Sequence, residues 1–228
     1  MRKRQIPNLR KPSKRIWKFC NRIQSRSENK RAAFSHKFTM EWILASASPR
    51  RKELLAEFIT NFEIIPAKGE ENAPSNLSPQ ELVKALARQK AVEVASLPQA
   101  KGKAVLGSDT VVAMDGTILG KPATKEDATA MLTALSGRAH EVYTGVCIVY
   151  PAALGKKELV EADCTRVHFN CLTKEQIAAY VATGSPMDKA GAYGIQDGGL
   201  VERIEGSFSN VVGLPLELVS RLLQKIEE

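Results

Sequence analysis

Four short segments of the chain combine hydroxyl groups, cations and glycines in patterns that suit a bound phosphate. They are Ser46–Arg51 (Ser-Ala-Ser-Pro-Arg-Arg), Gly107–Thr110 (Gly-Ser-Asp-Thr), Gly120–Pro122 (Gly-Lys-Pro) and Asp188–Gln196. Hydroxyl groups and the N–H groups at a helix start donate hydrogen bonds to anions, and arginine and lysine add positive charge. Together the four segments predict an enzyme that acts on a nucleotide.

The first segment combines a helix start with two arginines. Pro49 suits the first position of a helix. The N–H groups of that helix start, the Ser48 hydroxyl and the guanidinium groups of Arg50 and Arg51 together form a candidate anion site. The alternative is a simple Ser-Pro helix cap with two solvated arginines, and this segment by itself does not separate the two.

Asp109 stands inside a predicted strand of mostly apolar residues. A carboxylate is costly to bury unless it meets a cation or hydrogen-bond donors. A divalent metal or an activated water would supply that reason, and Glu71 in an earlier loop adds the oxygen ligands that Mg²⁺ or Mn²⁺ prefers. The alternatives are an aspartate bonded to nearby backbone N–H groups and a surface glutamate.

Three lysines and a glutamine complete the candidate set. Lys121 stands between a glycine and a proline, Lys189 begins a glycine-rich loop, and Lys90 extends from the apolar face of a predicted helix. Each ammonium group could reach a polyphosphate, although such lysines usually extend to solvent. Gln196 could both donate and accept a hydrogen bond at the edge of a base.

The net charge of +8 comes from one end of the chain. Residues 1–39 hold 13 Lys or Arg and a single acidic residue, hence +12, while the remainder carries 33 − 13 = 20 bases and 25 − 1 = 24 acids, hence −4. We expect a basic, disordered extension at 1–39 and one domain at 40–228. The extension could instead be a nucleic-acid arm, an organelle transit peptide or a stretch upstream of a true start at Met40.

Short apolar runs alternate with amphipathic stretches beyond Met40, which is the pattern of a mixed α/β domain. A change of parity in the apolar residues predicts a β-bulge near Thr165. The predicted strands are 42–45, 62–65, 104–114, 117–119, 141–150, 160–169 and 199–205, and the predicted helices are 49–58, 78–95, 125–135, 174–181 and a last one from 215.

Several classes of protein are excluded or disfavoured by what the sequence lacks. No apolar run approaches the ~18 residues that a membrane-spanning helix requires. There is no GxxxxGK[ST] loop, which argues against a P-loop kinase. The four cysteines form no CxxC pair, so we expect a reducing compartment, no structural zinc, and buried side chains for the three in or beside strands.

Seven segments, in this order, give the chain a resemblance to the Maf family of nucleotide pyrophosphatases, over roughly Trp42 to Leu223. They are Ser46-Ala-Ser-Pro-Arg-Arg-Lys-Glu-Leu-Leu, Leu86-Ala-Arg-Gln-Lys-Ala, Gly107-Ser-Asp-Thr-Val-Val, Gly120-Lys-Pro, Ser136-Gly-Arg-Ala-His-Glu-Val-Tyr-Thr-Gly-Val, Asp188-Lys-Ala-Gly-Ala-Tyr-Gly-Ile-Gln and Val212-Gly-Leu-Pro-Leu. Any one of them is weak, and seven in register are highly specific.

The resemblance implies a Maf/ITPase-like α/β fold, a mixed twisted sheet with flanking helices and two lobes around a central cleft. It implies hydrolysis of a nucleoside triphosphate to the monophosphate and pyrophosphate with a divalent metal, Mg²⁺ or Mn²⁺. Asp109 matches the family's proton acceptor, and Arg50, Thr110 and Gln196 match positions linked to base selection in the branch that favours dTTP and UTP.

On this interpretation Asp109 is catalytic and holds the metal together with Glu71. The expected substrate ligands are Ser48, Arg50, Arg51, Lys90, Thr110, Lys121, Lys189 and Gln196. The substrates are expected to be dTTP, UTP and modified pyrimidine nucleotides. The enzyme is expected to be cytoplasmic, to need neither membrane nor nucleic acid, and to be able to form a homodimer. Two other functions stay open, a nucleotide-binding regulator without catalysis and a nucleic-acid-binding protein acting through residues 1–39. If residues 1–39 are a transit peptide, the enzyme would instead be located in an organelle.

Overall fold

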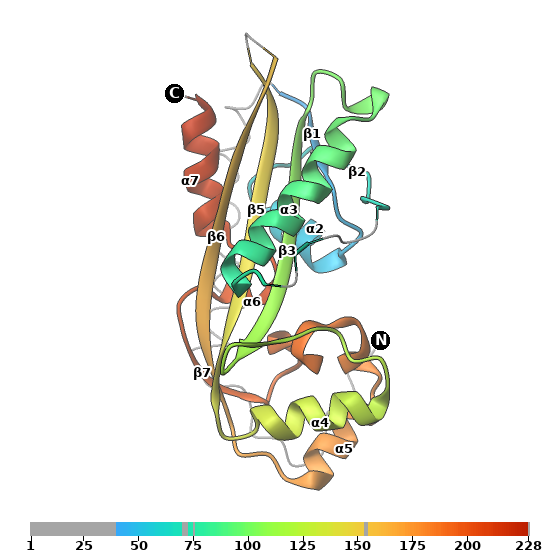
Figure 1. The fold of residues 1–228 in the computed structure, drawn as a ribbon, viewed down its shortest axis with the longest axis vertical. Coiled ribbons are helices and arrows are strands. Elements are labelled where there is room, and N and C mark those ends of the chain that lie inside the picture. Colours follow the sequence, from blue (N-terminus) through green and yellow to red (C-terminus); the bar gives the residue numbers. More distant parts are fainter. Residues whose placement is uncertain (1–39, 70–72, 75, 153–154, 228) are drawn as a thin grey trace. The chain divides into compact units, whose positions relative to one another are not determined.

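The computed structural model describes residues 40–69, 73–74, 76–152 and 155–227 (Figure 1). The predicted extension 1–39 and the predicted metal ligand Glu71 lie outside these ranges. The described chain divides into two compact units: unit 1 holds 111–142 and 165–206, and unit 2 holds the described residues up to 110, 143–164 and 207–227. The predicted organisation in two parts is therefore confirmed, and the cleft stays a prediction.

Seven strands form a mixed sheet, as the sequence predicted. In hydrogen-bonded order they are β2 (Phe62–Ile64), β1 (Trp42–Leu44), β3 (Ala104–Met114), β5 (Ala139–Ala152), β6 (Gly155–Phe169) and β7 (Val201–Glu205), with β4 (Thr117–Leu119) paired to β3. β1 runs parallel to both β2 and β3, whereas β4 is antiparallel to β3 and β7 is antiparallel to β6.

Each unit has its own helices. Unit 2 contains α2 (Pro49–Leu55), α3 (Pro79–Ala95), the turn η1 (Pro98–Ala100), α6 (Phe208–Val212) and α7 (Leu216–Glu227); unit 1 contains α4 (Lys125–Leu135), α5 (Lys174–Ala182) and the 3₁₀ turns η2 (Ser185–Asp188), η3 (Ala190–Ala192) and η4 (Ile195–Asp197). The sequence prediction missed α6, which it assigned to a loop, and extended α2 to Phe58. Within the described ranges, no helix has the length and apolar character needed to cross a bilayer.

Alternate residues of the unit 2 strands face two separate cores, because successive side chains of a strand point to opposite faces. Trp42 and Leu44 of β1 pack with apolar residues of α2 and α7, whereas Ile43 packs with alanines of α3. The same parity holds in β3, where Leu106 faces α2 and α7 while Val105 faces α3. The α3 helix lies across β3 and β5 in Figure 1.

Two glycines allow α3 to approach the sheet closely. A Cβ atom at Gly107 of β3 would lie 2.4 Å from the Ala87 carbonyl oxygen, and one at Gly145 of β5 would lie 2.2 Å from that of Val83. No side chain fits at such distances, so glycine is required at both positions. The α3 backbone therefore rests directly on the strand that carries Asp109.

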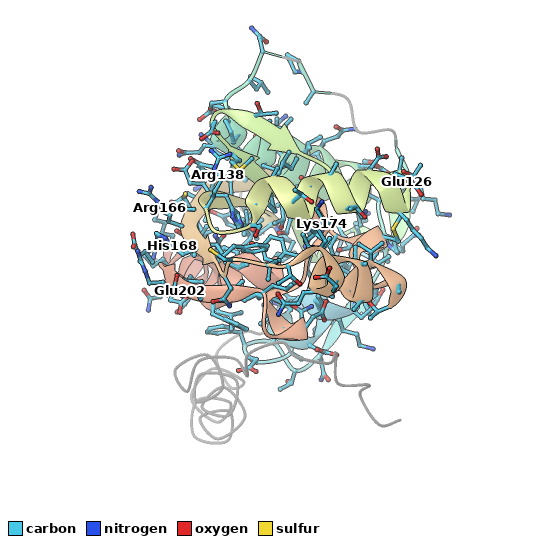
Figure 2. All side chains as sticks on the ribbon, turned by 90° about the horizontal axis from the view of Figure 1, so that it is seen from below. Glu126, Arg138, Arg166, His168, Lys174 and Glu202 are labelled. Atoms are coloured by element: carbon cyan, nitrogen blue, oxygen red, sulfur yellow. The ribbon has the colours of Figure 1, made fainter. Side chains whose placement is uncertain are left out.

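Unit 1 is built around α4 and α5, which pack against each other. Leu132, Leu135 and Ile177 are buried there. Figure 2 shows Glu126 at one end of α4 and Arg138 beyond the other, the arrangement that complements a helix dipole. The figure also labels Lys174 at the start of α5, and Arg166, His168 and Glu202 on the strands β6 and β7.

The pairing of β6 with β7 shifts register between His168 and Phe169, and the β-bulge expected near Thr165 stays a prediction. The prediction about the cysteines was wrong in part. Of the cysteines expected to be buried, only Cys147 is, and burial raises the pKa of its thiol to about 12, so it is unreactive. Cys164 and Cys171 are exposed, because one lies on the open face of a strand and the other follows its end.

The close approach of α3 leads to a prediction about stability. Replacing Gly107 with alanine forces either α3 or β3 to move, and overpacking of this kind costs about 1–3 kcal/mol. We expect the thermal unfolding midpoint of Gly107→Ala to fall by roughly 3–10 °C. Gly120→Ala is the matched control, since no atom lies within 4 Å of a Cβ placed there. An equal midpoint for the two variants would contradict the proposed contact.

Candidate active site

Asp109 points from β3 towards α3 and is 8% exposed. Its Oδ1 accepts a hydrogen bond from Nζ of Lys90, one turn beyond Ala87 on α3, at 2.5 Å. The structure thus supplies the cation that the buried carboxylate was predicted to need, and it supplies it from the protein. Lys90 does not extend to solvent, since only 19% of its side chain is exposed.

Arg51 joins three segments of unit 2. Its Nε donates to the Gly213 carbonyl oxygen at 2.9 Å, one terminal nitrogen donates to Ser46 Oγ at 3.3 Å, and the other donates to Thr110 Oγ1 at 3.1 Å. The planar guanidinium group holds its donors in a fixed fork, which suits three acceptors that come from separate segments. The interpretation of Arg51 as a solvated arginine is therefore wrong; its described bonds hold the start of α2 to β3 and to the chain between α6 and α7.

The start of α2 agrees with the sequence prediction. Pro49 is its first residue, and Ser48 caps it by accepting a hydrogen bond from the Arg51 backbone N–H. The Ser48 backbone N–H in turn donates to Ser46 Oγ at 3.2 Å. Arg50 is half-buried in the first turn. The predicted Ser-Pro cap and the predicted cationic cluster thus occur together in this segment.

Hydroxyl groups hold β3 on both sides of Asp109. Ser108 Oγ donates to the Gly213 carbonyl oxygen at 3.1 Å, and Thr110 Oγ1 lies 3.0 Å from Thr144 Oγ1. Thr144 donates onward to the Asn210 carbonyl oxygen at 2.9 Å. Because neighbouring residues of a strand face opposite ways, these bonds fix the face turned away from Asp109.

Sequence reasoning gave no role to Thr144, Asn210 or Gly213. Thr144 and Gly213 lie in segments that carried the family resemblance, Asn210 lies just before the last of these segments, and Thr144 and Asn210 are fully buried. Thr144 could have been noticed in the sequence, because it is a hydroxyl residue inside the nearly all-apolar strand β5. A buried hydroxyl needs a hydrogen-bond partner. Its partners come from distant parts of the chain, so the sequence could not name them.

In unit 1, two of the predicted segments are joined by a backbone hydrogen bond. The Gly191 N–H donates to the Gly120 carbonyl oxygen at 3.0 Å, which ties the turn holding Lys121 to the glycine-rich loop. Gly191 has φ of +67°, and a Cβ there would lie 2.9 Å from a methyl group of Val112, so the loop requires glycine. Lys121 itself is exposed.

Lys189 and Gln196 lie at the two ends of this loop. The Lys189 ammonium group donates to the Ser185 carbonyl oxygen at 2.5 Å, to Ser185 Oγ at 3.1 Å and to Asp188 Oδ1 at 2.6 Å. Only 10% of the Lys189 side chain is exposed, whereas Gln196 is exposed in η4. The lysine is therefore held in a defined position by its own loop.

The structure places the predicted residues in three groups. Lys90 contacts Asp109; Arg51 contacts Thr110 and adjoins Ser48 and Arg50; the unit 1 residues Lys121, Lys189 and Gln196 occupy two hydrogen-bonded segments. Across the described ranges, no three His, Cys, Asp or Glu side chains gather as a metal site. Asp109 alone still fits Mg²⁺, which often takes one or two carboxylates and completes its shell with waters and phosphate oxygens.

Comparison with known proteins gives a consistent result. Residues 41–226 match the Maf-like protein family. The dTTP/UTP pyrophosphatase of Thermococcus gammatolerans is 48% identical over 182 residues, which cover 79% of this chain and 94% of that protein. The dTTP/UTP pyrophosphatase of Bdellovibrio bacteriovorus is 46% identical over 190 residues, covering 80% and 97%.

Among solved structures, the Staphylococcus aureus Ham1 protein aligns with 57% of this chain and 71% of its own, at a TM-score of 0.41 and 15% identity. The family assignment depends on the sequence matches alone.

An aromatic cluster anchors the glycine-rich loop in unit 1. His140 Nε2 lies 2.7 Å from the Tyr193 hydroxyl, and both rings meet Phe169 edge-on, with ring centroids about 5 Å apart. Burial, and then the charge of His168, lower the pKa of His140 from 6.5 to about 4. Its Nδ1 has no hydrogen-bond partner among the described residues, so a proton there would be unpaired.

This lowered pKa predicts a pH dependence of stability. The unfolded chain binds a proton on His140 below pH 6.5 and the folded chain only below about pH 4, so stability is complete above pH 6.5 and falls as the pH drops towards 4. The difference between the pKa values of His140 in the unfolded and folded chain corresponds to about 3 kcal/mol in the free energy of unfolding. Thermal unfolding at pH 7.5 and pH 4.5 should show a smaller acid-induced loss in His140→Gln than in the unsubstituted protein. Equal losses would show that another group controls this range.

Proposed function

The chain belongs to the Maf family, and we propose that within it this protein hydrolyses dTTP and UTP to the nucleoside monophosphate and pyrophosphate. The assignment to nucleoside triphosphate pyrophosphatases follows from the curated relatives, which carry that name and are covered almost end to end. The observation that carries the proposal in the structure is Asp109, a carboxylate buried in β3 beside a lysine. Such a group is expensive to keep in a folded protein, and acid–base catalysis gives a reason to keep it.

In the proposed reaction Asp109 accepts a proton from a water molecule as that water attacks the α-phosphorus. A new bond forms between the water oxygen and the α-phosphorus, the bond from this phosphorus to the bridging oxygen breaks, and pyrophosphate leaves with that oxygen. Lys90 holds Oδ1 of the carboxylate. Oδ2 is then the oxygen that takes the proton.

The predicted cations and hydroxyls of both units are proposed to hold the triphosphate. Arg50 and Ser48 would do so from the start of α2, and Lys121 and Lys189 from unit 1. Fixed positive groups stabilise the charge that develops on the leaving pyrophosphate. Arg51 would contribute by holding Thr110 and the start of α2 in place, because its guanidinium group donates to Thr110, Gly213 and Ser46.

A divalent cation, Mg²⁺ or Mn²⁺, is part of the proposal. Asp109 and Glu71 would hold it. When bound, it would neutralise phosphate charge and polarise the oxygens of the substrate.

Base selection is proposed to depend on Arg50, Thr110 and Gln196. Thr110 already accepts a hydrogen bond from Arg51, so its hydroxyl is oriented before a nucleotide arrives. Gln196 is exposed and could donate and accept at the edge of a pyrimidine. We include modified pyrimidine nucleotides among the candidate substrates, and a cytoplasmic enzyme that forms a homodimer stays our expectation.

A substrate panel tests the proposal. The full-length protein is incubated with dTTP, UTP, 5-methyl-UTP, CTP, dATP and GTP, with Mg²⁺ or Mn²⁺, and released pyrophosphate is measured. We expect dTTP and UTP to give the largest kcat/KM and a chelator to stop the reaction. Binding of dTTP without turnover would instead indicate a regulator. The remaining alternative is a nucleic-acid-binding protein that acts through residues 1–39. It would release no pyrophosphate, and its affinity for nucleic acid would fall with salt and vanish when residues 1–39 are removed.

The proton acceptor is tested by Asp109→Asn, which keeps the shape of the side chain and removes its basicity. We expect kcat for dTTP to fall by roughly 10² to 10⁴, the usual contribution of a general base. Asp163→Asn on β6 of the same unit is the matched control and should retain normal turnover. The variant should stay folded by circular dichroism; near-normal hydrolysis by Asp109→Asn would mean that another base acts.

A further inference from the structure

The segment from Ser185 to Asp197 carries Lys189 and Gln196 on three short 3₁₀ turns, η2, η3 and η4. Turns of this length have few backbone hydrogen bonds of their own. Their positions therefore depend on bonds from side chains around them. The described residues of unit 1 show which side chains provide these bonds.

One tyrosine hydroxyl closes the turn that carries Gln196. Tyr180 Oη, on α5, accepts a hydrogen bond from the Gly194 N–H at 3.0 Å and donates one to Asp197 Oδ2 at 2.7 Å. The Asp197 N–H donates back to the Gly194 carbonyl oxygen at 3.0 Å. Both ends of the Gly194–Asp197 turn are thus attached to the same hydroxyl, with Gln196 between them.

The same carboxylate reaches Lys189 through a serine. Ser185 Oγ donates to Asp197 Oδ2 at 2.7 Å and accepts from Lys189 Nζ at 3.1 Å, while the Ser185 carbonyl oxygen accepts from Nζ at 2.5 Å. A continuous chain of hydrogen bonds therefore runs from Tyr180 through Asp197 and Ser185 to Lys189. In each of these hydrogen bonds, a hydroxyl or ammonium group donates and a carboxylate, hydroxyl or carbonyl oxygen accepts.

Steric contacts reinforce the arrangement. A Cβ at Gly194 would lie 2.8 Å from Asp197 Oδ2 and 2.8 Å from Lys189 Cε, so both side chains fold over the glycine. Tyr180 is 1% exposed, which makes its hydroxyl a fixed anchor on α5. Burial, and then the charge of Asp197, raise the pKa of Tyr180, so the hydroxyl keeps the proton that it donates.

We propose that Tyr180, Asp197 and Ser185 are positioning residues that fix Lys189 and Gln196 for nucleotide binding. The proposal depends on the function proposed above, in which Lys189 contacts phosphate and Gln196 contacts the base. None of the three residues needs to touch the substrate. They reduce the conformational freedom that the loop would lose when a nucleotide binds.

The test compares Tyr180→Phe, Asp197→Asn and Ser185→Ala with the unsubstituted protein, using Tyr150→Phe of unit 2 as the matched control. KM and kcat are measured for UTP, and Kd is measured for the slowly hydrolysed analogue α,β-imido-UTP. We expect KM and Kd to rise about 3- to 10-fold, the range that one hydrogen bond of ordinary strength gives, with kcat within about twofold. The control should match the unsubstituted protein.

A double-mutant cycle separates positioning from a general structural effect. If Tyr180 acts on binding through Lys189, Tyr180→Phe should raise Kd much less in a Lys189→Met background than in the native one. Equal effects in both backgrounds would overturn the role through Lys189. Unchanged KM and Kd in a folded Tyr180→Phe would overturn the proposal.

The outcomes also distinguish this proposal from the function on which it depends. An unsubstituted protein that binds α,β-imido-UTP but releases no pyrophosphate would refute the hydrolysis, while the Kd values still test the positioning. Loss of nucleotide binding in the unsubstituted protein would refute both. Should Tyr180→Phe fail to fold, Ser185→Ala decides, because Ser185 is only half-buried and is not part of the buried core. An unchanged Kd for Ser185→Ala refutes the proposal.

Discussion

The burial of one carboxylate constrains most of unit 2. Asp109 lies inside a strand that also carries Val105 and Leu106, where an unpaired charge would be expensive, and Lys90 is the partner that makes it tolerable. That partner can be present only if α3 lies directly on β3. Gly107 and Gly145 permit this approach, so two residues without side chains determine the position of a charged pair.

The opposite face of β3 is constrained by hydrogen bonds instead of by close packing. Ser108 and Thr110, on either side of Asp109, are held through Gly213, Arg51 and Thr144. A strand fixed on one face by hydroxyls and on the other by an ion pair has little freedom to rotate. The orientation of the carboxylate is therefore set before any ligand binds, as electrostatic preorganisation requires.

The candidate residues of unit 1 are held in position differently, because they lie on turns instead of on strands. The loop after α5 is held by the Tyr180 hydroxyl, by the contact between His140 and Tyr193, and by a backbone bond from Gly191 to Gly120. The anchoring side chains of Tyr180, His140 and Tyr193 are buried, while Gln196 and Lys121 are exposed. Rigid support beneath accessible polar groups is the arrangement that a binding loop needs.

The sequence by itself determined the class of fold, most element positions, the cap at Ser48 and the family, because these depend on local periodicity, capping chemistry and ordered motifs. It also showed that Asp109 needed a partner. It could not identify that partner as Lys90, or find α6, Thr144 and Asn210, because hydrogen bonds between distant segments leave no local pattern. The tertiary structure decided which residues meet, since only the register of packed strands and helices brings such groups within bonding distance.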